Sequence, residues 1–151
     1  MQHKITQVLM DANFLMIPYQ FRIDILSEIA RLVDRNYELV TLAEVVDELR
    51  KISGRDNFNR QKTGKEKKIK GRDRIAAGVA LEIIESEGIR IINYKNENYT
   101  NTDDLILDYA LEHSKSGEVL VCTNDKALKK RLVSENIRII YMRKKNYLEM
   151  G

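Results

Sequence analysis

Residues 8–15 read VLMDANFL, an apolar run that stops at Asp11 and resumes after Asn13. The part up to Met10 has the length and apolar character of a buried strand, and Asp11 stands where that strand would end. An aspartate in this position is commonly a turn residue or a helix N-cap. It can also be a ligand of a metal ion, and the rest of the chain has to decide between these interpretations.

The composition is that of a globular protein. With 151 residues, 43% of them hydrophobic and 32% charged, we expect residues 1–151 to form a single folded domain. No apolar run approaches the roughly 18–20 residues of a membrane span, and the apolar stretch near the N-terminus is too short for a signal peptide. We therefore expect a cytoplasmic protein with no membrane partner.

The charge of the chain is unevenly distributed. Residues 51–74 contain ten Lys/Arg and three Asp/Glu, a net charge of +7, whereas the rest contains 16 Lys/Arg and 20 Asp/Glu, a net charge of −4. A mildly acidic body thus carries one strongly basic segment. Within it, residues 53–71 are poor in apolar side chains and contain glycine and serine breakers, which predicts a long loop insertion.

Predicted strands and helices alternate along the chain. Apolar runs predict strands at 7–10, 37–40, 89–92, 118–123 and 137–142. Helical spacing predicts helices at 20–36, 41–51, 72–88, 102–115 and 126–134. Short, continuously apolar strands between helices are typical of a parallel sheet that is covered on both faces. The fold class is therefore α/β: three α/β/α layers around a central, mostly parallel five-stranded sheet.

Several local signals predict where helices begin. Residues 13–36 are expected to be mostly helical, and because Pro18 interrupts their beginning, we expect a short turn or helix before Pro18 and the main helix from about Gln20. Thr41-Leu-Ala-Glu44 has the form of a capping box, and Thr102 is a plausible N-cap of a later helix. In the helix at 72–88, one apolar face is expected, and Gly88 is the expected residue just past its end. The face is predicted to comprise Ile75, Ala76, Val79, Ala80, Ile83 and Ile84.

Acidic residues stand at positions that such a sheet would bring together. Asp11 follows the first strand and Asp125 follows the fourth, Asp103 begins the helix before that strand, and Glu48 lies inside the second helix. Each alone has an ordinary explanation as a cap, a dipole partner or a solvated side chain. Ligands of such sheets bind outside the carboxyl ends of the strands. One cysteine and two histidines leave carboxylates as the available metal ligands, which favours Mg²⁺ or Mn²⁺.

Four segments, in this order and at these separations, resemble the acidic blocks of PIN-domain nucleases. They are VLMDANFL, VVDEL, TDDLILDYA and VCTNDKALKKRL, and the resemblance extends over essentially the whole chain. The stretches MDANFLMIPYQF and RIIYMRKKNYLE resemble most the branch related to small-subunit pre-rRNA endonucleases and their archaeal relatives. The resemblance implies a PIN-like fold and a metal-dependent endoribonuclease that leaves 5′-phosphate and 3′-hydroxyl ends.

The resemblance also implies roles for individual residues. The catalytic, metal-binding acids would be Asp11, Glu48, Asp103 and Asp125, with Asp104 in reserve because the pair of aspartates leaves a one-residue ambiguity. Supporting roles would fall to Asn13, Thr123 and Asn124. A hydroxyl or amide at the last two positions could hold Asp11 or a metal-bound water. The implied cofactor is Mg²⁺ or Mn²⁺.

The basic segment is interpreted as a phosphate-binding arm that offsets the repulsion between an acidic site and nucleic acid. Its candidate nucleic-acid-binding residues are Arg60, Lys62, Lys65, Lys67, Lys68, Lys70, Arg72 and Arg74. A solvated loop is the alternative. The same alternative holds for a second basic patch at Arg143–Lys145, near Tyr141 and Tyr147.

The expected partner is RNA, and by resemblance a precursor of ribosomal RNA; ribosome-maturation proteins and a homodimer are further expectations. Two other functions stay open at this point. The first is a catalytically weak RNA-binding scaffold in a ribosome-maturation complex. The second is a receiver-like α/β module that binds Mg²⁺ for signalling, although no pair of adjacent acids precedes Asp11.

Overall fold

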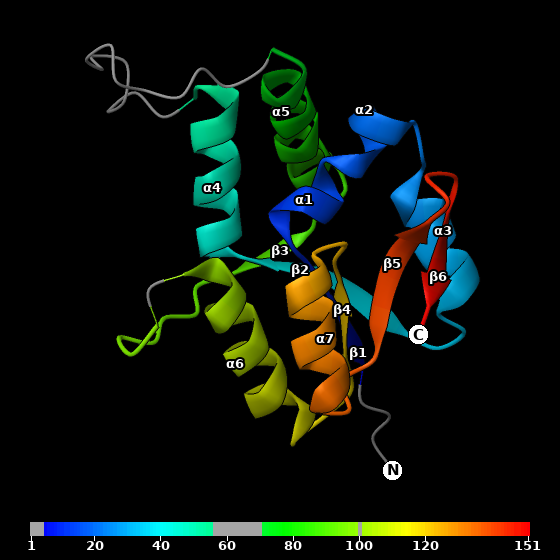
Figure 1. Cartoon of the computed structure of the whole chain (residues 1–151), viewed down its shortest axis with the longest axis vertical. Helices are drawn as coiled ribbons and strands as arrows, with labels where there is room; N and C mark the ends of the chain where they lie inside the picture. The colour runs from blue at the N-terminus through cyan, green and yellow to red at the C-terminus, as the bar shows by residue number, and fades with distance from the viewer. Residues whose placement is uncertain (1–4, 56–70, 100) are drawn as a thin grey trace.

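The computed structural model describes residues 5–55, 71–99 and 101–151, and its centre is a six-stranded sheet (Figure 1). The strands are β1 Thr6–Met10, β2 Tyr37–Leu42, β3 Arg90–Ile92, β4 Val119–Cys122, β5 Ile139–Arg143 and β6 Tyr147–Met150. Their order is β3-β2-β1-β4-β5-β6; the pairs up to β5 are parallel and β6 is antiparallel to β5. The predicted α/β class is confirmed. The strand count of five was wrong, because a hairpin adds β6.

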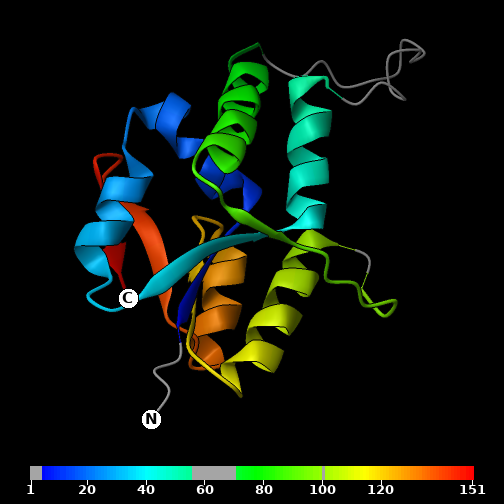
Figure 2. The same cartoon turned by 180° about the vertical axis from the view of Figure 1, so that it is seen from behind.

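Seven helices in the described residues surround this sheet. They are α1 Ala12–Leu15, α2 Ile17–Phe21, α3 Ile25–Leu32, α4 Ala43–Ser53, α5 Gly71–Ser86, α6 Thr102–Ser114 and α7 Lys126–Ser134. In Figures 1 and 2, α6 and α7 cover one face of the sheet, and α3 covers the other face beside β5 and β6. Figure 1 also shows α1, α2, α4 and α5 beyond the end at which β1 and β4 finish. None of the described helices is both long and apolar enough to cross a membrane.

The strand β1 lies in the middle of the sheet and in the core of the molecule. Val8 pairs with Leu39 of β2 and with Leu120 of β4, and the side chains of Val8 to Met10 are inaccessible to solvent. In a strand that is buried on both faces, side chains pointing to either face must be apolar, so apolar and polar residues do not alternate. The central position of β1 therefore explains the continuous apolar run before Asp11.

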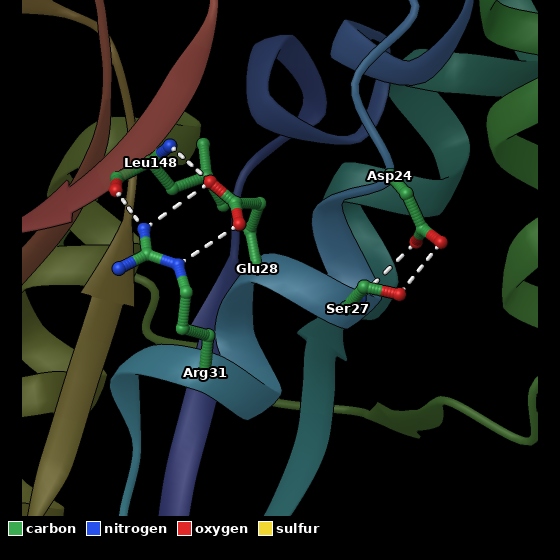
Figure 3. A network of polar contacts seen from close by, with 5 residues as sticks. All are labelled: Asp24, Ser27, Glu28, Arg31 and Leu148. Carbon is green, nitrogen blue, oxygen red and sulfur yellow. Dashed lines mark hydrogen bonds and ion pairs between the residues drawn. The ribbon is translucent and has the colours of Figure 1, made fainter.

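The predicted helix at 20–36 is wrong, because the chain forms separate short helices there. Pro18 lies in the first turn of α2, where its missing N–H costs no hydrogen bond, so it begins this helix rather than interrupting one. Arg22 adopts a left-handed conformation with φ of 55° and ends α2. Asp24 then caps α3 by accepting hydrogen bonds from the Ser27 amide at 3.1 Å and the Ser27 hydroxyl at 2.7 Å (Figure 3).

The capping box predicted at Thr41 is also wrong. The strand β2 continues through Leu42, and the buried Thr41 hydroxyl donates a 2.8 Å hydrogen bond to the carbonyl oxygen of Met10. At the start of α6, Asn101 rather than Thr102 is the N-cap and accepts from the Asp104 amide at 2.8 Å. The first error arises because a threonine hydroxyl can satisfy a backbone group of a neighbouring strand as readily as a helix end. The second moves the cap by one residue and leaves the predicted start of the helix at 102 in place.

The apolar face of α5 is narrower than its spacing predicts. Its buried residues are Ala76, Ala77, Ala80 and Ile84, whereas Ile75 is 50% exposed, so the predicted face is wrong at that position. Gly88 has a φ of 61° just past the helix, as expected of a residue that reverses the chain there. Most of the predicted loop insertion, residues 56–70, lies outside the described residues.

The edge strand β6 is held by side chains of α3 (Figure 3). Glu28 Oε1 accepts a 3.0 Å hydrogen bond from the Leu148 amide, and Arg31 Nη2 donates at 2.9 Å to the Leu148 carbonyl oxygen. Arg31 also pairs with Glu28 at 3.0 Å. The side-chain contacts satisfy backbone groups that an edge strand otherwise leaves open to further strands.

We predict that Asp24→Ala lowers the free energy of unfolding by about 1 kcal/mol, because α3 loses its N-cap. Urea denaturation measures the loss. The control is Asp34→Ala, which removes a carboxylate whose side chain is 88% exposed and should change stability by less than about 0.5 kcal/mol. Equal effects of the two substitutions would contradict the role of Asp24.

Candidate active site

The Thr123 hydroxyl joins the carboxyl ends of β1 and β4. It donates to Asp11 Oδ2, and it accepts a 3.1 Å hydrogen bond from the Asp125 amide. Asp11 Oδ1 accepts from the Phe14 amide at 2.8 Å, so Asp11 is also the N-cap of α1. Both oxygens of the Asp11 carboxyl group are therefore oriented by the protein itself, and the hydroxyl of Thr123 lies between two of the predicted acids.

Asp11 is a buried acid. It is only 5% exposed, and burial raises its pKa to about 7 from an ordinary value of 3.8. The hydrogen bonds from Thr123 and Phe14 act in the opposite direction, and the negative charges of Asp103 and Glu48 raise the pKa further. Two acids that are remote in the sequence thus lie close enough to Asp11 for their charges to act on it.

Glu48, Asp103 and Asp125 join Asp11 in a set of four acids that we call the acidic group. Glu48 is an exposed residue of α4, yet loss of hydration against the surrounding protein raises its pKa, and the charge of Asp103 adds to the effect. Asp103, in the first turn of α6, has its pKa raised by partial burial and then by the charge of Asp125. Each of these acids carries a penalty for ionising that a nearby cation would relieve.

Asp104 has a different environment from its neighbour Asp103. Its carboxylate pairs with Arg131 of α7, with Nη1 and Oδ1 2.9 Å apart. Arg131 also lowers the pKa of Asp103, against the larger effects that raise it. The geometry of the two aspartates therefore differs: Asp104 has a cation of its own, whereas Asp103 acts on the other acids.

The remaining predicted residues take structural positions around this group. Asp125 caps α7 by accepting from the Leu128 amide at 2.8 Å. Asn124 Oδ1 accepts a 2.7 Å hydrogen bond from the Met142 amide, which ties the Thr123–Asp125 loop to β5. Asn13 is exposed in α1. The N-cap interpretation of Asp11 and Asp125 is thus correct, and it does not prevent either carboxylate from facing the acidic group.

The carboxylate oxygens of the acidic group are suitable ligands for a hard cation, but their present positions do not bring them together around one point. All are carboxylate oxygens, which Mg²⁺ and Mn²⁺ prefer. Within residues 5–55, 71–99 and 101–151, no group of three or more His, Cys, Asp or Glu side chains is placed to hold a metal ion. Asp11 and Asp125 are each drawn towards a helix N-terminus, so a metal would have to share these oxygens with the cap amides.

Six of the predicted nucleic-acid-binding cations, Arg60 to Lys70, lie outside the described residues. Arg72 and Arg74 are exposed in the first turn of α5. Two residues near the acidic group were missed by the sequence analysis: Thr41, taken for a helix cap, and Arg131. The basic run Lys129–Arg131 so soon after Asp125 was the available signal for the second.

Comparison with known proteins adds a family assignment. The sequence profile described as "PIN like domain" matches residues 8–145. The chain is also 32% identical, over 146 residues and 95% of both chains, to a protein of Methanocaldococcus jannaschii called "Ribonuclease VapC4".

Solved structures resemble the fold. The structure titled "Structure of the PIN domain endonuclease Utp24" has a TM-score of 0.68 and 23% identity, and covers 96% of this chain and 90% of its own. The VapBC-1 structure from nontypeable Haemophilus influenzae has a TM-score of 0.51 and 18% identity, with 85% and 93% covered. At these identities the likeness concerns the fold alone, and it confirms the predicted PIN-like architecture.

The pKa of Asp11 predicts a pH dependence of stability in the metal-free protein. The folded protein keeps the proton of Asp11 up to about pH 7, whereas the unfolded chain loses it near 3.8. Between these values the folded state binds more protons, so stability falls as the pH rises, by up to about 4 kcal/mol.

Asp11→Asn removes this contribution, and urea denaturation in chelator should show a shallower fall for the variant between about pH 4 and pH 7. The other titrating groups are common to both proteins and cancel in the comparison. Parallel curves for the two proteins would mean that Asp11 ionises normally in the fold.

Proposed function

This chain belongs to the PIN-like domain family, and from that premise we propose that it is a metal-dependent endoribonuclease that hydrolyses phosphodiester bonds of RNA. Family membership sets aside the receiver-like alternative. The observation that carries the proposal is the buried Asp11, whose pKa is raised by burial and by the charges of Asp103 and Glu48. The similarity to a protein named as a ribonuclease, at 32% identity, supports the proposed activity.

The proposed metal-binding residues are Asp11, Glu48, Asp103 and Asp125, with Asp104 as the reserve. A bound Mg²⁺ or Mn²⁺ would supply the activation of water and the neutralisation of charge on the phosphodiester. The penalty that Asp11, Glu48 and Asp103 carry for ionising together supports this choice, since a divalent cation is the partner that would offset it. We favour Asp103 over Asp104 because Arg131 already pairs with Asp104.

The supporting residues act on the acids rather than on the substrate. The Thr123 hydroxyl orients the Asp11 carboxyl group, and through the Asp125 amide it keeps the two strand ends in register. Asn124 holds the same loop against β5. We propose that Arg131 holds the Asp104 carboxylate away from the metal-binding acids. For Asn13, which is exposed in α1, we propose a supporting role in the same pocket.

For the substrate, we propose a precursor of ribosomal RNA, on the resemblance of MDANFLMIPYQF and RIIYMRKKNYLE to that branch. The basic segment, of which Arg72 and Arg74 are described, would contact its phosphates. We further propose a cytoplasmic location, a single domain with the basic loop insertion, and assembly with ribosome-maturation proteins or with a second copy. A catalytically weak RNA-binding scaffold is the alternative function.

We predict that Asp11→Asn and Glu48→Gln each reduce cleavage of single-stranded RNA in Mn²⁺ by at least about 100-fold, because each removes a charged metal ligand. A gel assay of 5′-labelled RNA measures the rate. Asp47→Asn is the matched control: Asp47 precedes Glu48 on α4, is 56% exposed and lies 3.8 Å from Arg50. Asp103→Asn should lower the rate more than Asp104→Asn.

Unchanged cleavage by Asp11→Asn would refute the catalytic proposal. A wild-type protein that binds RNA in Mn²⁺ and never cuts it would establish the scaffold alternative instead.

We also predict that Mn²⁺ raises the stability of the wild-type protein at a pH above 7, where Asp11 is ionised. At about 100 times the dissociation constant, the gain is about 2.7 kcal/mol. Thermal denaturation with Mn²⁺, and with NaCl at the same ionic strength, separates binding from screening. An equal shift in Asp11→Asn would place the cation elsewhere.

A further inference from the structure

We propose that a cationic strip at the carboxyl-end side of the sheet binds single-stranded RNA beside the acidic group. The strip consists of Arg72, Arg22 and the Lys144–Lys145 turn, with Tyr19 as a stacking platform. The proposal rests on the proposed ribonuclease function, and it names the surface that would hold the substrate.

The first part of the strip is a surface hollow between α2 and α5. It has a volume of about 260 Å³ and is lined by Pro18, Tyr19, Gln20, Arg22 and Arg72. The guanidinium group of Arg72 is fixed at its wall, because Nη2 donates a 2.6 Å hydrogen bond to the Gln20 carbonyl oxygen. The hollow therefore combines two exposed arginines with an aromatic ring that is 38% exposed.

The second part is the turn between β5 and β6. The Asn146 amide donates to the Arg143 carbonyl oxygen at 3.1 Å, and the two central residues, Lys144 and Lys145, have φ of 53° and 54°. Positive φ at both central positions is the signature of a type I′ turn, for which Asn-Gly is the preferred pair. Two lysines are an unfavourable choice for this backbone, and such a choice is a reason to look for a function.

Arg22 also has the left-handed backbone conformation, which residues other than glycine and asparagine rarely adopt. Among the described residues, four non-glycine residues have positive φ, and Arg22, Lys144 and Lys145 are three of them. In Figures 1 and 2 alike, the β5–β6 turn lies beside the connection between α2 and α3, where Arg22 is the C-cap of α2. Two connections that carry left-handed cations, from distant parts of the chain, are thus neighbours in both views.

Hydrogen bonds anchor both strands of the turn, one of them to the loop that carries Asp125. At its base, the Met142 amide donates to Asn124 Oδ1, one residue from Asp125. On its other strand, Leu148 is held through its backbone by Glu28 and Arg31 (Figure 3). Because β5 is parallel to β4, the turn leaves the sheet at the edge where Asp125 follows β4.

The chemistry of the strip favours a nucleic-acid strand over other anions. Guanidinium and ammonium groups bind successive phosphates, and an exposed tyrosine next to them offers a ring on which a base can stack. No carboxylate is among the described residues that line the hollow, and the two that stand close to its arginines in the sequence have partners: Asp73 accepts from Gln20 at 3.3 Å, and Asp24 caps α3. Free phosphate or an acidic peptide would use the cations and leave the ring unused.

Binding of fluorescent oligo(U) to the full chain, measured by anisotropy in chelator so that no cleavage occurs, tests the strip. In Arg22→Asn with Arg72→Gln, affinity should fall and the slope of log K against log salt should become shallower by about 1.4, or about 0.7 per lost phosphate contact. Asparagine is chosen at position 22 because it tolerates the left-handed conformation. Tyr19→Ala should weaken binding about 5-fold or more, whereas Tyr19→Phe should not.

The turn offers a variant that separates binding from folding. Lys144→Asn with Lys145→Gly installs the preferred turn pair, so the melting temperature should rise by about 2–4 °C. The same double variant should bind oligo(U) less tightly and show a shallower salt dependence. A loss of affinity in a more stable protein is not the result of damage to the fold.

The control is Arg138→Gln, an exposed cation at the amino end of β5, on the opposite edge of the sheet. Unchanged affinity in the Arg22/Arg72 and Lys144/Lys145 variants, or a loss equal to that of Arg138→Gln, would overturn the proposal. So would competition by a poly-glutamate peptide as effective as that of oligo(U), which would indicate a protein ligand. Equal binding of oligo(dT) would widen the ligand to single-stranded nucleic acid.

Because binding is measured without metal, the result does not depend on catalysis. If the proposed ribonuclease function fails but the strip is real, the protein binds oligo(U) in chelator and does not cleave RNA in Mn²⁺. If only the strip fails, the protein cleaves RNA and the strip variants bind oligo(U) as the wild type does.

Discussion

The hydrogen bond from the Thr123 hydroxyl to the Asp11 carboxyl group is the contact on which the rest of the site depends. It connects two neighbouring parallel strands at the point where both end, and the same hydroxyl accepts from the Asp125 amide. Asp11 also caps α1, so its carboxyl group connects the end of the central strand with the start of a helix and is itself the buried member of the acidic group. In the low dielectric of the protein interior a hydrogen bond is strong, and a buried acid without a hydrogen-bond partner would lower the free energy of unfolding.

The same arrangement creates an electrostatic conflict. Burial and two nearby carboxylates oppose the ionisation of Asp11, while the bonds from Thr123 and Phe14 favour it. Structural needs alone would be met as well by an asparagine or a serine at this N-cap. A fold that buries a carboxyl group, with a pKa near 7 that two further acids help to raise, carries a local instability, and such instabilities are concentrated at functional sites.

Basic side chains lie on the same side of the molecule as this acidic group. Arg131 neutralises Asp104, and Arg22, Arg72 and the Lys144–Lys145 turn are placed on the side of the molecule where the strands end. An acidic centre repels a polyanion, so a substrate with many phosphates needs cations close by, and those cations must not collapse onto the acids. The hydrogen bond between the Met142 amide and Asn124 ties the loop that carries Asp125 to β5, the strand that leads into the Lys144–Lys145 turn.

Much of the fold could be predicted from the sequence, and so could the list of candidate acids. Buried parallel strands are continuous apolar runs, and α7 has the predicted bounds of 126 and 134, because in both cases the local pattern reflects burial directly. The helix cap at Thr41 was wrong because the Thr41 hydroxyl bonds the Met10 carbonyl oxygen of a neighbouring strand, a partner that the local sequence does not reveal, whereas α6 begins at residue 102 as predicted. The sixth strand was missed because β6 has only four residues, and the Lys144–Lys145 turn that pairs it with β5 lacks the Asn-Gly signal of a hairpin.

The sequence by itself determined the layered α/β architecture and the residue types available for chemistry, because burial and donor chemistry are properties of local pattern and composition. Only the tertiary structure decided which carboxylates act on one another. Asp103 and Asp104 are adjacent in the chain and chemically identical, yet one acts on Asp11 and Glu48 while the other pairs with Arg131. Electrostatic interaction depends on distance and on the surrounding medium, and both are set by how α4, α6 and α7 pack around the ends of β1 and β4.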